Sequence, residues 1–427
     1  MAETNRRYAS TKLWLPTLLF GDGLLYAVIV MAIVMMHRFG ATRSEALLSS
    51  TFLCLPLALR PLLEAVVTFF RGTTKVWVLS AEFISALSLC ALAFILPTGH
   101  WRQASLCFLM FFVVSSEFGS IAVTRFYLTD ALPRGFFRHG FAPLFRCLAL
   151  VFGVGICATL AGNMEVLTRD IRYSWSLAAY VVAGVEFFLW LWHSVFLPGG
   201  KTVWCGRKDL SGVHFSDIKV AFRSLLQARR SRAMLLFLFL FALPEATLAL
   251  VSPLFMVDAA HNGGLGLAPQ EFGLVFGTVA VAAFFFGERF GQTLIRHFSL
   301  RRIVLPAALL MSLHGVAMLL LSCNPTASFP LATLATLVGY AAVGFSAAVF
   351  SAAVRLFADA DSPLLRRAVV YSVVALTVVS AAVVISVLPQ GMGYRQWFGV
   401  ATLLYIAPLA AAIWFFKTRK ILFDNAD

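Results

Sequence analysis

The sequence has little charge. Asp, Glu, Lys and Arg make up 13% of its 427 residues, against about a quarter in an ordinary soluble domain. Apolar residues make up 60%, and 41 residues are phenylalanine. A soluble core could not hide so much apolar surface, so most of the surroundings of this chain must be lipid. The composition therefore excludes an ordinary soluble domain.

Acidic residues are the scarcer charge, with 20 Asp and Glu against 34 Lys and Arg, which gives a formal net charge of +14. Such an excess can indicate nucleic-acid binding. Here, however, the basic residues lie in short segments between apolar runs, a placement typical of a polytopic membrane protein that faces anionic lipid. We therefore expect a lipid bilayer, and no nucleic acid, as a partner.

The sequence also lacks the motifs of common catalytic and metal sites. It has no glycine-rich phosphate loop, no HExxH pair and no GxSxG turn. Its seven Cys residues show no zinc-type or haem-type spacing. These absences predict that the protein is not an enzyme and that it holds no cofactor and no metal ion.

What the sequence does contain is a series of long apolar runs. A helix needs about 20 apolar residues to cross a bilayer. By this measure the chain is an all-α polytopic membrane protein with twelve spans. The predicted spans cover residues 13–36, 46–70, 76–97, 103–129, 140–162, 174–197, 233–257, 270–294, 303–322, 328–354, 367–388 and 396–416.

The basic residues predict the orientation of these spans. If the N-terminus is cytoplasmic, 25 of the 34 Lys and Arg fall in cytoplasmic segments and six in external ones. Basic residues concentrate on the cytoplasmic side of membrane proteins, so both termini are predicted to be cytoplasmic. The most basic loop, 198–232, separates an N-terminal bundle, 1–197, from a C-terminal bundle, 233–427. This linker is either an interfacial helix on anionic lipid or a solvated connector.

Six spans, a basic loop and six further spans form the layout of the major facilitator superfamily. In that fold, two six-helix bundles move around a site near the middle of the bilayer. The layout predicts a transporter of a small solute, and it leaves the solute open.

Several stretches resemble the AmpG-like permeases, a branch of that superfamily. They are WLPTLLFGDGLLYAV, LCLPLALRPLLEA, TKVWVLSAE, MGYRQWF and, most specifically, FALPEATLALVSPLFMVDAAHNGGLGLAPQEFGLVFGTVAV. The resemblance covers most of the chain. It implies a permease of the bacterial inner membrane that imports anhydro-muropeptides or related sugar-peptides together with protons.

The chain also departs from that family. The stretch FGSIAVTRFYL has Ser120 and Thr124 where the family has acids, and Arg125 precedes its Phe-Tyr pair. The loop between the second and third spans lacks the usual aspartate. These departures keep open two alternatives, namely a membrane scaffold or sensor that no longer transports, and a permease for another small solute such as a drug or sugar.

Two acids within predicted spans are candidates for proton coupling. Asp22 lies near the middle of the first span, and Glu245 lies near the middle of the seventh. They occupy matching positions of the two halves, since FGDG aligns with LPEA. Ionisable groups at membrane depth are costly and therefore usually functional. The alternative is a neutral acid that is hydrogen-bonded across a helix interface.

Other polar residues within the spans are candidates for solute binding. Arg146 would meet an anionic group of the solute, unless it only extends to the cytoplasmic edge. Arg125 would do the same, or belong to the cytoplasmic rim. Tyr26 and Tyr127 would stack on sugar rings. The remaining candidates are Arg60 and Glu117.

Four residues are candidates for gating. Glu64 lies four residues after Arg60, so the two share a helix face and can form a self-contained pair or a gate. Gly287, Glu288 and Arg289 belong to the second-half counterpart of the conserved loop between spans two and three. Taken together, the sequence predicts a monomeric, proton-coupled permease that works by alternating access.

Overall fold

A computed structural model describes residues 2–69, 73–129, 141–198, 223, 227–324, 328–358, 363–387 and 392–417. These residues form helices joined by short connections, and no β-strand occurs among them. Ten of the described helices are long and apolar enough to cross a membrane. The prediction of an all-α membrane protein is therefore confirmed.

The apolar side chains do not all turn inward. Phe94, Phe286 and Leu403 are each about two-thirds exposed or more, and in a soluble protein such a density of exposed apolar residues would mark an interaction surface. On a helix of membrane length, these side chains face lipid.

Two of the twelve predicted spans are not among these ten helices. The predicted span 46–70 is interrupted: α2 (Arg43–Ala58) ends before Leu59, and α3 (Arg60–Phe69) begins next to Pro61. Pro61 has no backbone N–H, so it cannot form the i→i−4 hydrogen bond that would continue the helix across Leu59. The predicted span 367–388 falls in α16 (Pro363–Val387), whose described apolar stretch, Val369–Ile385, is shorter than the other ten.

The chain divides into two compact units, each built from more than one segment. Unit 1 comprises Met1–Ala41, Leu62–Gly212 and Ala268–Thr278. Unit 2 comprises Thr42–Pro61, Val213–Leu267 and Val279–Asp427. Most of the predicted linker, 198–232, lies outside the described residues.

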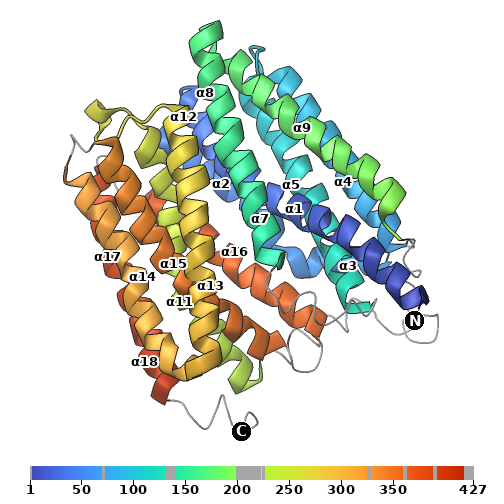
Figure 1. Ribbon diagram of the computed structural model, residues 1–427. Helices are drawn as coiled ribbons and strands as arrows, with labels where there is room; N and C mark the ends of the chain where they lie inside the picture. The colour runs from blue at the N-terminus through green and yellow to red at the C-terminus, as the bar shows by residue number, and fades with distance from the viewer. Residues whose placement is uncertain are drawn as a thin grey trace. The chain divides into compact units, whose positions relative to one another are not determined.

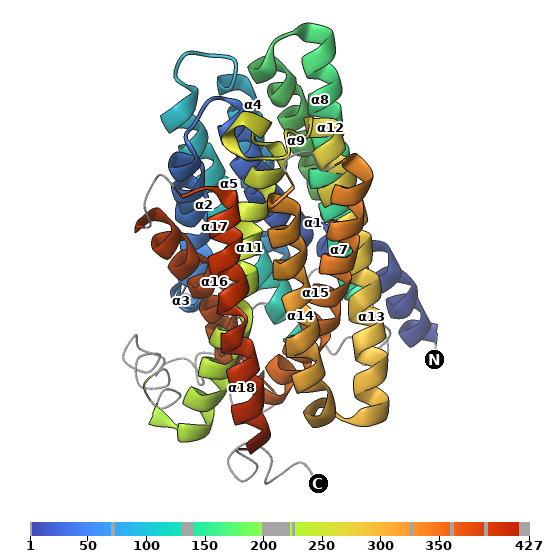
Figure 2. The same cartoon turned by 90° about the vertical axis from the view of Figure 1, so that its left-hand side faces the viewer.

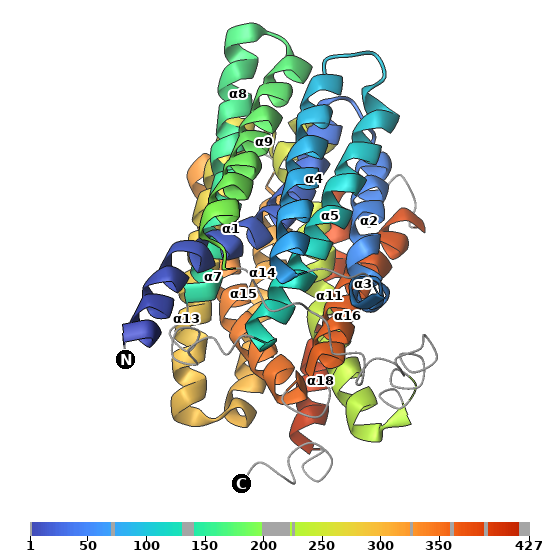
Figure 3. The same cartoon turned by 90° about the vertical axis from the view of Figure 1, so that its right-hand side faces the viewer.

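Unit 1 is a helical bundle in which α1 and α4 are central. Helix α4 packs against α5 and α9, and α1 packs against α7, α9 and α5, as Figure 3 shows. The short α12 packs against α8. The elements are α1 (Ala2–Arg38), most of α3, α4 (Thr74–Ile95), α5 (Trp101–Thr129), α7 (Phe141–Leu150), η1 (Val151–Ile156), α8 (Cys157–Thr168), α9 (Ile171–Phe196), α12 (Pro269–Phe272) and most of η3 (Gly273–Val279).

Glycines allow η1 and η3 of unit 1 to approach closely. A Cβ on Gly277 would lie 2.3 Å from the backbone nitrogen of Gly155, and one on Gly273 would lie 2.6 Å from the Gly155 oxygen. No side chain fits in this space, so the π-helical turns of the two segments meet backbone to backbone.

Unit 2 is a second bundle around α11 and α15. Helix α15 packs against α13 and α14, while α11 packs against α16, α18 and α17. Figure 2 shows α13, α14 and α15 side by side and α17 leading into α18. The elements are α2, α11 (Arg229–Val257), η2 (Ala260–Asn262), α13 (Ala280–Phe298), α14 (Leu300–Ser322), α15 (Phe329–Ala358), α16, α17 (Tyr394–Leu404) and α18 (Ile406–Lys417), and most of them are labelled in Figure 1.

Polar residues fix where several helices begin. Thr42 caps α2 by accepting a hydrogen bond from the Glu45 nitrogen at 3.2 Å, while Glu45 accepts one from the Thr42 nitrogen at 2.8 Å. Asp170 caps α9 by accepting from the Tyr173 nitrogen at 3.1 Å. Each cap satisfies backbone N–H groups that a helix start leaves without an intrahelical partner.

Candidate functional site

Asp22 and Arg146 form an ion pair inside unit 1. The Arg146 Nε and Nη2 atoms lie 2.7 Å and 2.6 Å from Asp22 Oδ2. The Asp22 side chain is 6% exposed, whereas that of Arg146 is 41% exposed. Two candidates that the sequence placed 124 residues apart are thus brought together. The buried carboxylate has a charge partner, and that partner keeps access to its surroundings.

A glycine beside Asp22 makes this contact possible. A Cβ on Gly23 would lie 2.9 Å from Arg146 Cα and 2.7 Å from Ala149 Cβ. Helix α7 can therefore lie directly against α1 only because residue 23 has no side chain. Gly21, by contrast, has ordinary space around it.

Asp22 also lines a small polar cavity of unit 1. The cavity has a volume of about 40 Å³ and lies between α1, α4, α5 and α9. Its polar lining comes from three acids and three serines, namely Asp22, Glu82, Glu186, Ser85, Ser116 and Ser120. A space of this size and polarity can hold a few water molecules, but it is too small for a sugar-peptide.

Glu82 and Glu186, which are not among the candidates predicted from the sequence, both line this cavity. Glu82 Oε1 lies 2.5 Å from His193 Nδ1, and His193 Nε2 lies 2.8 Å from Thr17 Oγ1. A signal was present in the sequence, because Glu186 and His193 are seven residues apart and so share one face of α9.

Glu245 occupies a hydrogen-bonded cluster of unit 2. Its Oε2 lies 2.9 Å from His314 Nδ1, and its Oε1 accepts a hydrogen bond from the Tyr405 hydroxyl. The ring of Tyr340 packs on His314 with a centroid separation of 4.7 Å. Helices α11, α14 and α15 and the junction of α17 and α18 thus supply one cluster around the second candidate acid.

Three of the other solute-binding candidates, Arg60, Glu117 and Tyr26, have described side chains, and two do not. Arg60 is 1% exposed, and its guanidinium carbon lies 4.2 Å from the ring centroid of Tyr371, a cation–π arrangement. Glu117 is buried in α5, and Tyr26 is partly buried in α1. The side chains of Arg125 and Tyr127 lie outside the described residues.

Three gating candidates lie on α13 of unit 2. A Cβ on Gly287 would lie 2.1 Å from the Ala341 oxygen, so this glycine lets α13 and α15 pack closely. Glu288 Oε1 accepts a hydrogen bond from Gln292 at 2.9 Å, and Arg289 Nη2 lies 3.9 Å from Glu288 Oε2. The fourth candidate, Glu64, is buried in α3.

The GGLGL loop of unit 2 surrounds Asp258 at the end of α11. Asp258 Oδ2 accepts hydrogen bonds from Arg43 Nε and the Tyr394 hydroxyl, both at 2.9 Å. Arg43 also lies over the Tyr394 ring, 4.5 Å from its centroid, and donates to the Asn262 oxygen at 2.7 Å. A Cβ on Gly264 would lie 2.2 Å from the Asp258 oxygen. The motif therefore has a clear structural use, which the sequence alone did not reveal.

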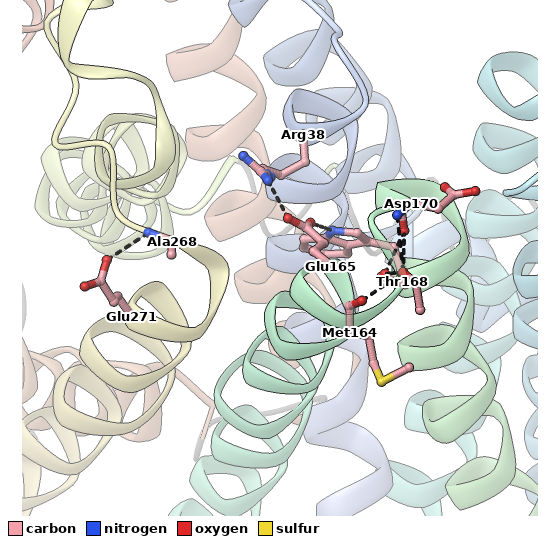
Figure 4. Close-up of polar contacts among 9 residues, drawn as sticks. Arg38, Met164, Glu165, Thr168, Asp170, Ala268 and Glu271 are labelled. Atoms are coloured by element: carbon pink, nitrogen blue, oxygen red, sulfur yellow. Dashed lines mark hydrogen bonds and ion pairs between the residues drawn. The ribbon is translucent and has the colours of Figure 1, made fainter.

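A further polar cluster of unit 1 joins the ends of α1, α8 and α9. Figure 4 shows Arg38 pointing at Glu165, with which it forms an ion pair. The other Glu165 oxygen accepts a hydrogen bond from Trp175 Nε1 at 2.7 Å. Thr168 and Asp170 form the turn between α8 and α9 beside this pair.

No protein-family model and no curated protein sequence matches the chain. Solved structures, however, resemble its fold. The nucleoside transporter NupG aligns with 95% of this chain and 99% of its own, at a TM-score of 0.66 and 13% identity.

Two other structures are similar. The bacterial homolog of the human lysosomal transporter Spinster, in an inward-facing and unoccupied conformation, covers 98% of this chain and 97% of its own, with a TM-score of 0.62 and 15% identity. The E. coli fucose:proton symporter FucP covers 94% and 97%, with a TM-score of 0.62 and 14% identity. At these identities the likeness establishes architecture alone. The chain is therefore a multi-pass membrane protein with the fold of the major facilitator superfamily.

Proposed function

We propose that this chain is a proton-coupled secondary transporter that works by alternating access. The observation that carries the proposal is the ion pair of Asp22 with Arg146, in which Asp22 also lines the polar cavity of unit 1. A buried carboxylate near the middle of a membrane helix is expensive, and such groups mark ion and proton pathways. Fold likeness to transporters supports the same reading.

The geometry suggests how a proton and an anionic solute would be coupled. Asp22 holds the Arg146 guanidinium through one carboxylate oxygen, while 41% of the Arg146 side chain stays exposed. A proton on Asp22 cancels the charge that holds Arg146. Arg146 cannot lose its own charge and would then take an anionic group of the solute. Proton binding thereby favours solute binding, which is the condition for symport.

Glu245 would act as the corresponding acid of unit 2. Its two oxygens are held by His314 and Tyr405, so a proton gained or lost there is shared within a hydrogen-bonded cluster. His314 is a second group in this cluster that can carry a proton.

For the solute we propose an anionic sugar-peptide of the anhydro-muropeptide type, imported across a bacterial inner membrane by a monomer. The motif resemblance and the exposed guanidinium of Arg146 support this class. The excess of basic residues in one set of loops supports cytoplasmic termini. We further propose that 1–197 and 233–427 move as the two bundles, joined by the 198–232 linker, with Glu64, Gly287, Glu288 and Arg289 at moving contacts.

The test is uptake into proteoliposomes with and without an inward proton gradient. Labelled anhydro-muropeptide, a nucleoside and fucose form the panel, and we expect gradient-driven uptake of the first. Asp22→Asn should abolish the stimulation by the gradient, because residue 22 can no longer bind a proton. Asp170→Asn is the matched control, since Asn also caps a helix well.

Two results would overturn the proposal. Uptake by Asp22→Asn that is still driven by protons at the wild-type level would remove the coupling role. Failure of the folded wild-type protein to take up any solute of the panel would remove the transport proposal and favour a scaffold or sensor.

A further inference from the structure

Unit 1 holds a second group of ionisable side chains that the proposed coupling through Asp22 does not use. Glu82 lies on α4, while Glu186 and His193 lie on α9. Glu82 and Glu186 line the cavity that Asp22 also lines. His193 is fully buried behind Glu82 and reaches α1 through Thr17.

The hydrogen bonds of His193 require one proton between Glu82 and His193. The Thr17 hydroxyl donates to the Trp14 carbonyl at 2.8 Å, so its oxygen must accept from His193 Nε2, 2.8 Å away. Nε2 therefore carries a hydrogen, and a neutral imidazole would leave Nδ1 as a bare acceptor. Nδ1 lies 2.5 Å from Glu82 Oε1. Two acceptors cannot make this contact, so one proton lies on Nδ1 or on Glu82.

Glu186 adds a buried carboxyl group to the cavity that Asp22 and Glu82 also line. It is 3% exposed, and Glu82 Oε2 is a buried oxygen with no hydrogen-bond partner among the described protein atoms. Two ionised carboxylates on one small cavity would repel each other, and a buried charge without a partner is costly. A proton on Glu186 relieves both penalties and provides a donor toward the cavity.

The cavity can connect these groups by water. Its volume of about 40 Å³ exceeds what one water needs, and its walls carry the hydroxyls of Ser85, Ser116 and Ser120 beside the acids. In the described part of the chain, no group of three His, Cys, Asp or Glu is placed to hold a metal ion. The acids and hydroxyls of the lining can hold water and exchange protons with it.

We propose that Glu82, Glu186 and His193 form a proton-binding site in unit 1, which cavity water connects to Asp22. Among the other charged groups of unit 1, Arg146 pairs with Asp22, Lys75 donates to the Ser194 carbonyl at 2.9 Å, and Glu117 is buried in α5. The role of the site in a transport cycle rests on the function proposed above. Its binding of protons does not.

Infrared difference spectroscopy of the full chain in lipid tests the proposal directly. Spectra recorded at low and high pH should contain the carbonyl band of a buried, protonated carboxylic acid. Glu186→Gln should remove this band, and Glu82→Gln should shift or remove its His193-coupled component. Asp170→Asn, in the exposed turn before α9, should leave these bands unchanged. A Glu186→Gln spectrum identical to that of the wild type would overturn the proposal.

One further variant and one change of cation distinguish proton binding from loss of the fold and from sodium binding. Glu186→Asp retains a carboxyl group and should shift the band without removing it, which separates proton binding from loss of fold. If Glu186→Asp shows no such band at any position, as Glu186→Gln does, the assignment of the band to residue 186 is overturned. A band that responds to sodium in place of choline at constant pH, and not to pH, would assign the cavity to sodium and also overturn it.

Transport gives a separate readout. Glu186→Gln should lower the number of protons carried per solute, whereas Asp22→Asn should abolish coupling. If Asp22→Asn abolishes coupling while Glu186→Gln leaves the infrared band unchanged, the proposed function stands and this site does not. If the band disappears in Glu186→Gln but the chain moves no solute, the site stands without the proposed function.

Discussion

Arg146 contacts a single oxygen of Asp22 with two nitrogens of its guanidinium, at 2.6 Å and 2.7 Å. The acid belongs to α1 and the arginine to α7, and Gly23 allows the two helices to meet next to this contact. One end of the pair is buried and the other is partly exposed. The pair is therefore both a structural bond between two helices and an accessible positive group.

The first prediction concerns the coupling energy of this pair. Arg146→Gln removes the guanidinium that pairs with the buried Asp22 carboxylate, so we expect a loss of unfolding free energy. Breaking a buried pair costs about 3–5 kcal/mol, and the exposure of Arg146 should reduce this to about 1–3 kcal/mol. Asp22→Asn alone should also destabilise the protein, because it removes the negative charge that pairs with Arg146. The double variant should be more stable than the sum of the single effects implies. Thermal unfolding of the four proteins in one detergent measures this, and strict additivity would contradict it.

A second prediction concerns Tyr394 in unit 2. Tyr394→Phe removes the hydroxyl that donates to Asp258 at 2.9 Å but keeps the ring beneath Arg43. A hydrogen bond to a charged group contributes about 1.5–3 kcal/mol, so the unfolding temperature should fall by several degrees. Tyr173→Phe is the control, because Tyr173 is 46% exposed and should change little. Equal unfolding temperatures for both variants would show that the Asp258 contact contributes nothing.

Gly264 provides a third prediction. Gly264→Ala would place a Cβ 2.2 Å from the backbone oxygen of Asp258, closer than any real contact allows. The loop must then move, and the contacts of Asp258 with Arg43 and Tyr394 should weaken. Gly399→Ala is the matched control: Gly399 lies inside α17 with open space around it, and alanine favours a helix by about 1 kcal/mol over glycine. We expect a lower unfolding temperature for the first variant and an equal or higher one for the second. A lower unfolding temperature for Gly399→Ala than for Gly264→Ala would refute the close approach of Gly264 to Asp258.

The fourth prediction concerns Arg38 and Glu165 at the ends of α1 and α8. Arg38→Gln removes the cation but leaves Glu165 bonded to Trp175. Because the Arg38 side chain is 30% exposed and that of Glu165 is 10% exposed, we expect a loss of about 1–2 kcal/mol. Arg38→Lys should recover part of it, since a lysine restores the charge but not the planar guanidinium. Chemical or thermal unfolding of the three proteins provides the measurement, and a Lys variant no better than Gln would contradict a charge contribution.

The sequence by itself determined the fold class and the presence of an acid at the centre of α1 and of α11. Hydropathy and helix length are local properties, so a series of apolar runs specifies membrane helices before any tertiary contact is considered. The same local view missed the break at Leu59, which separates α2 from α3, because the apolar run continues through it.

Only the tertiary structure decided which side chains meet. Asp22 and Arg146 are 124 residues apart, Glu82 and His193 are 111 apart, and Glu245 and His314 are 69 apart. Each pair depends on the rotation of two helices about their axes, and the Asp22–Arg146 pair also depends on the close approach that Gly23 allows. Neither the rotation nor the approach follows from hydropathy. For this reason the sequence shows only that Asp22 is an acid within an apolar run. The packing of α1, α4, α7 and α9 supplies its partner and its cavity.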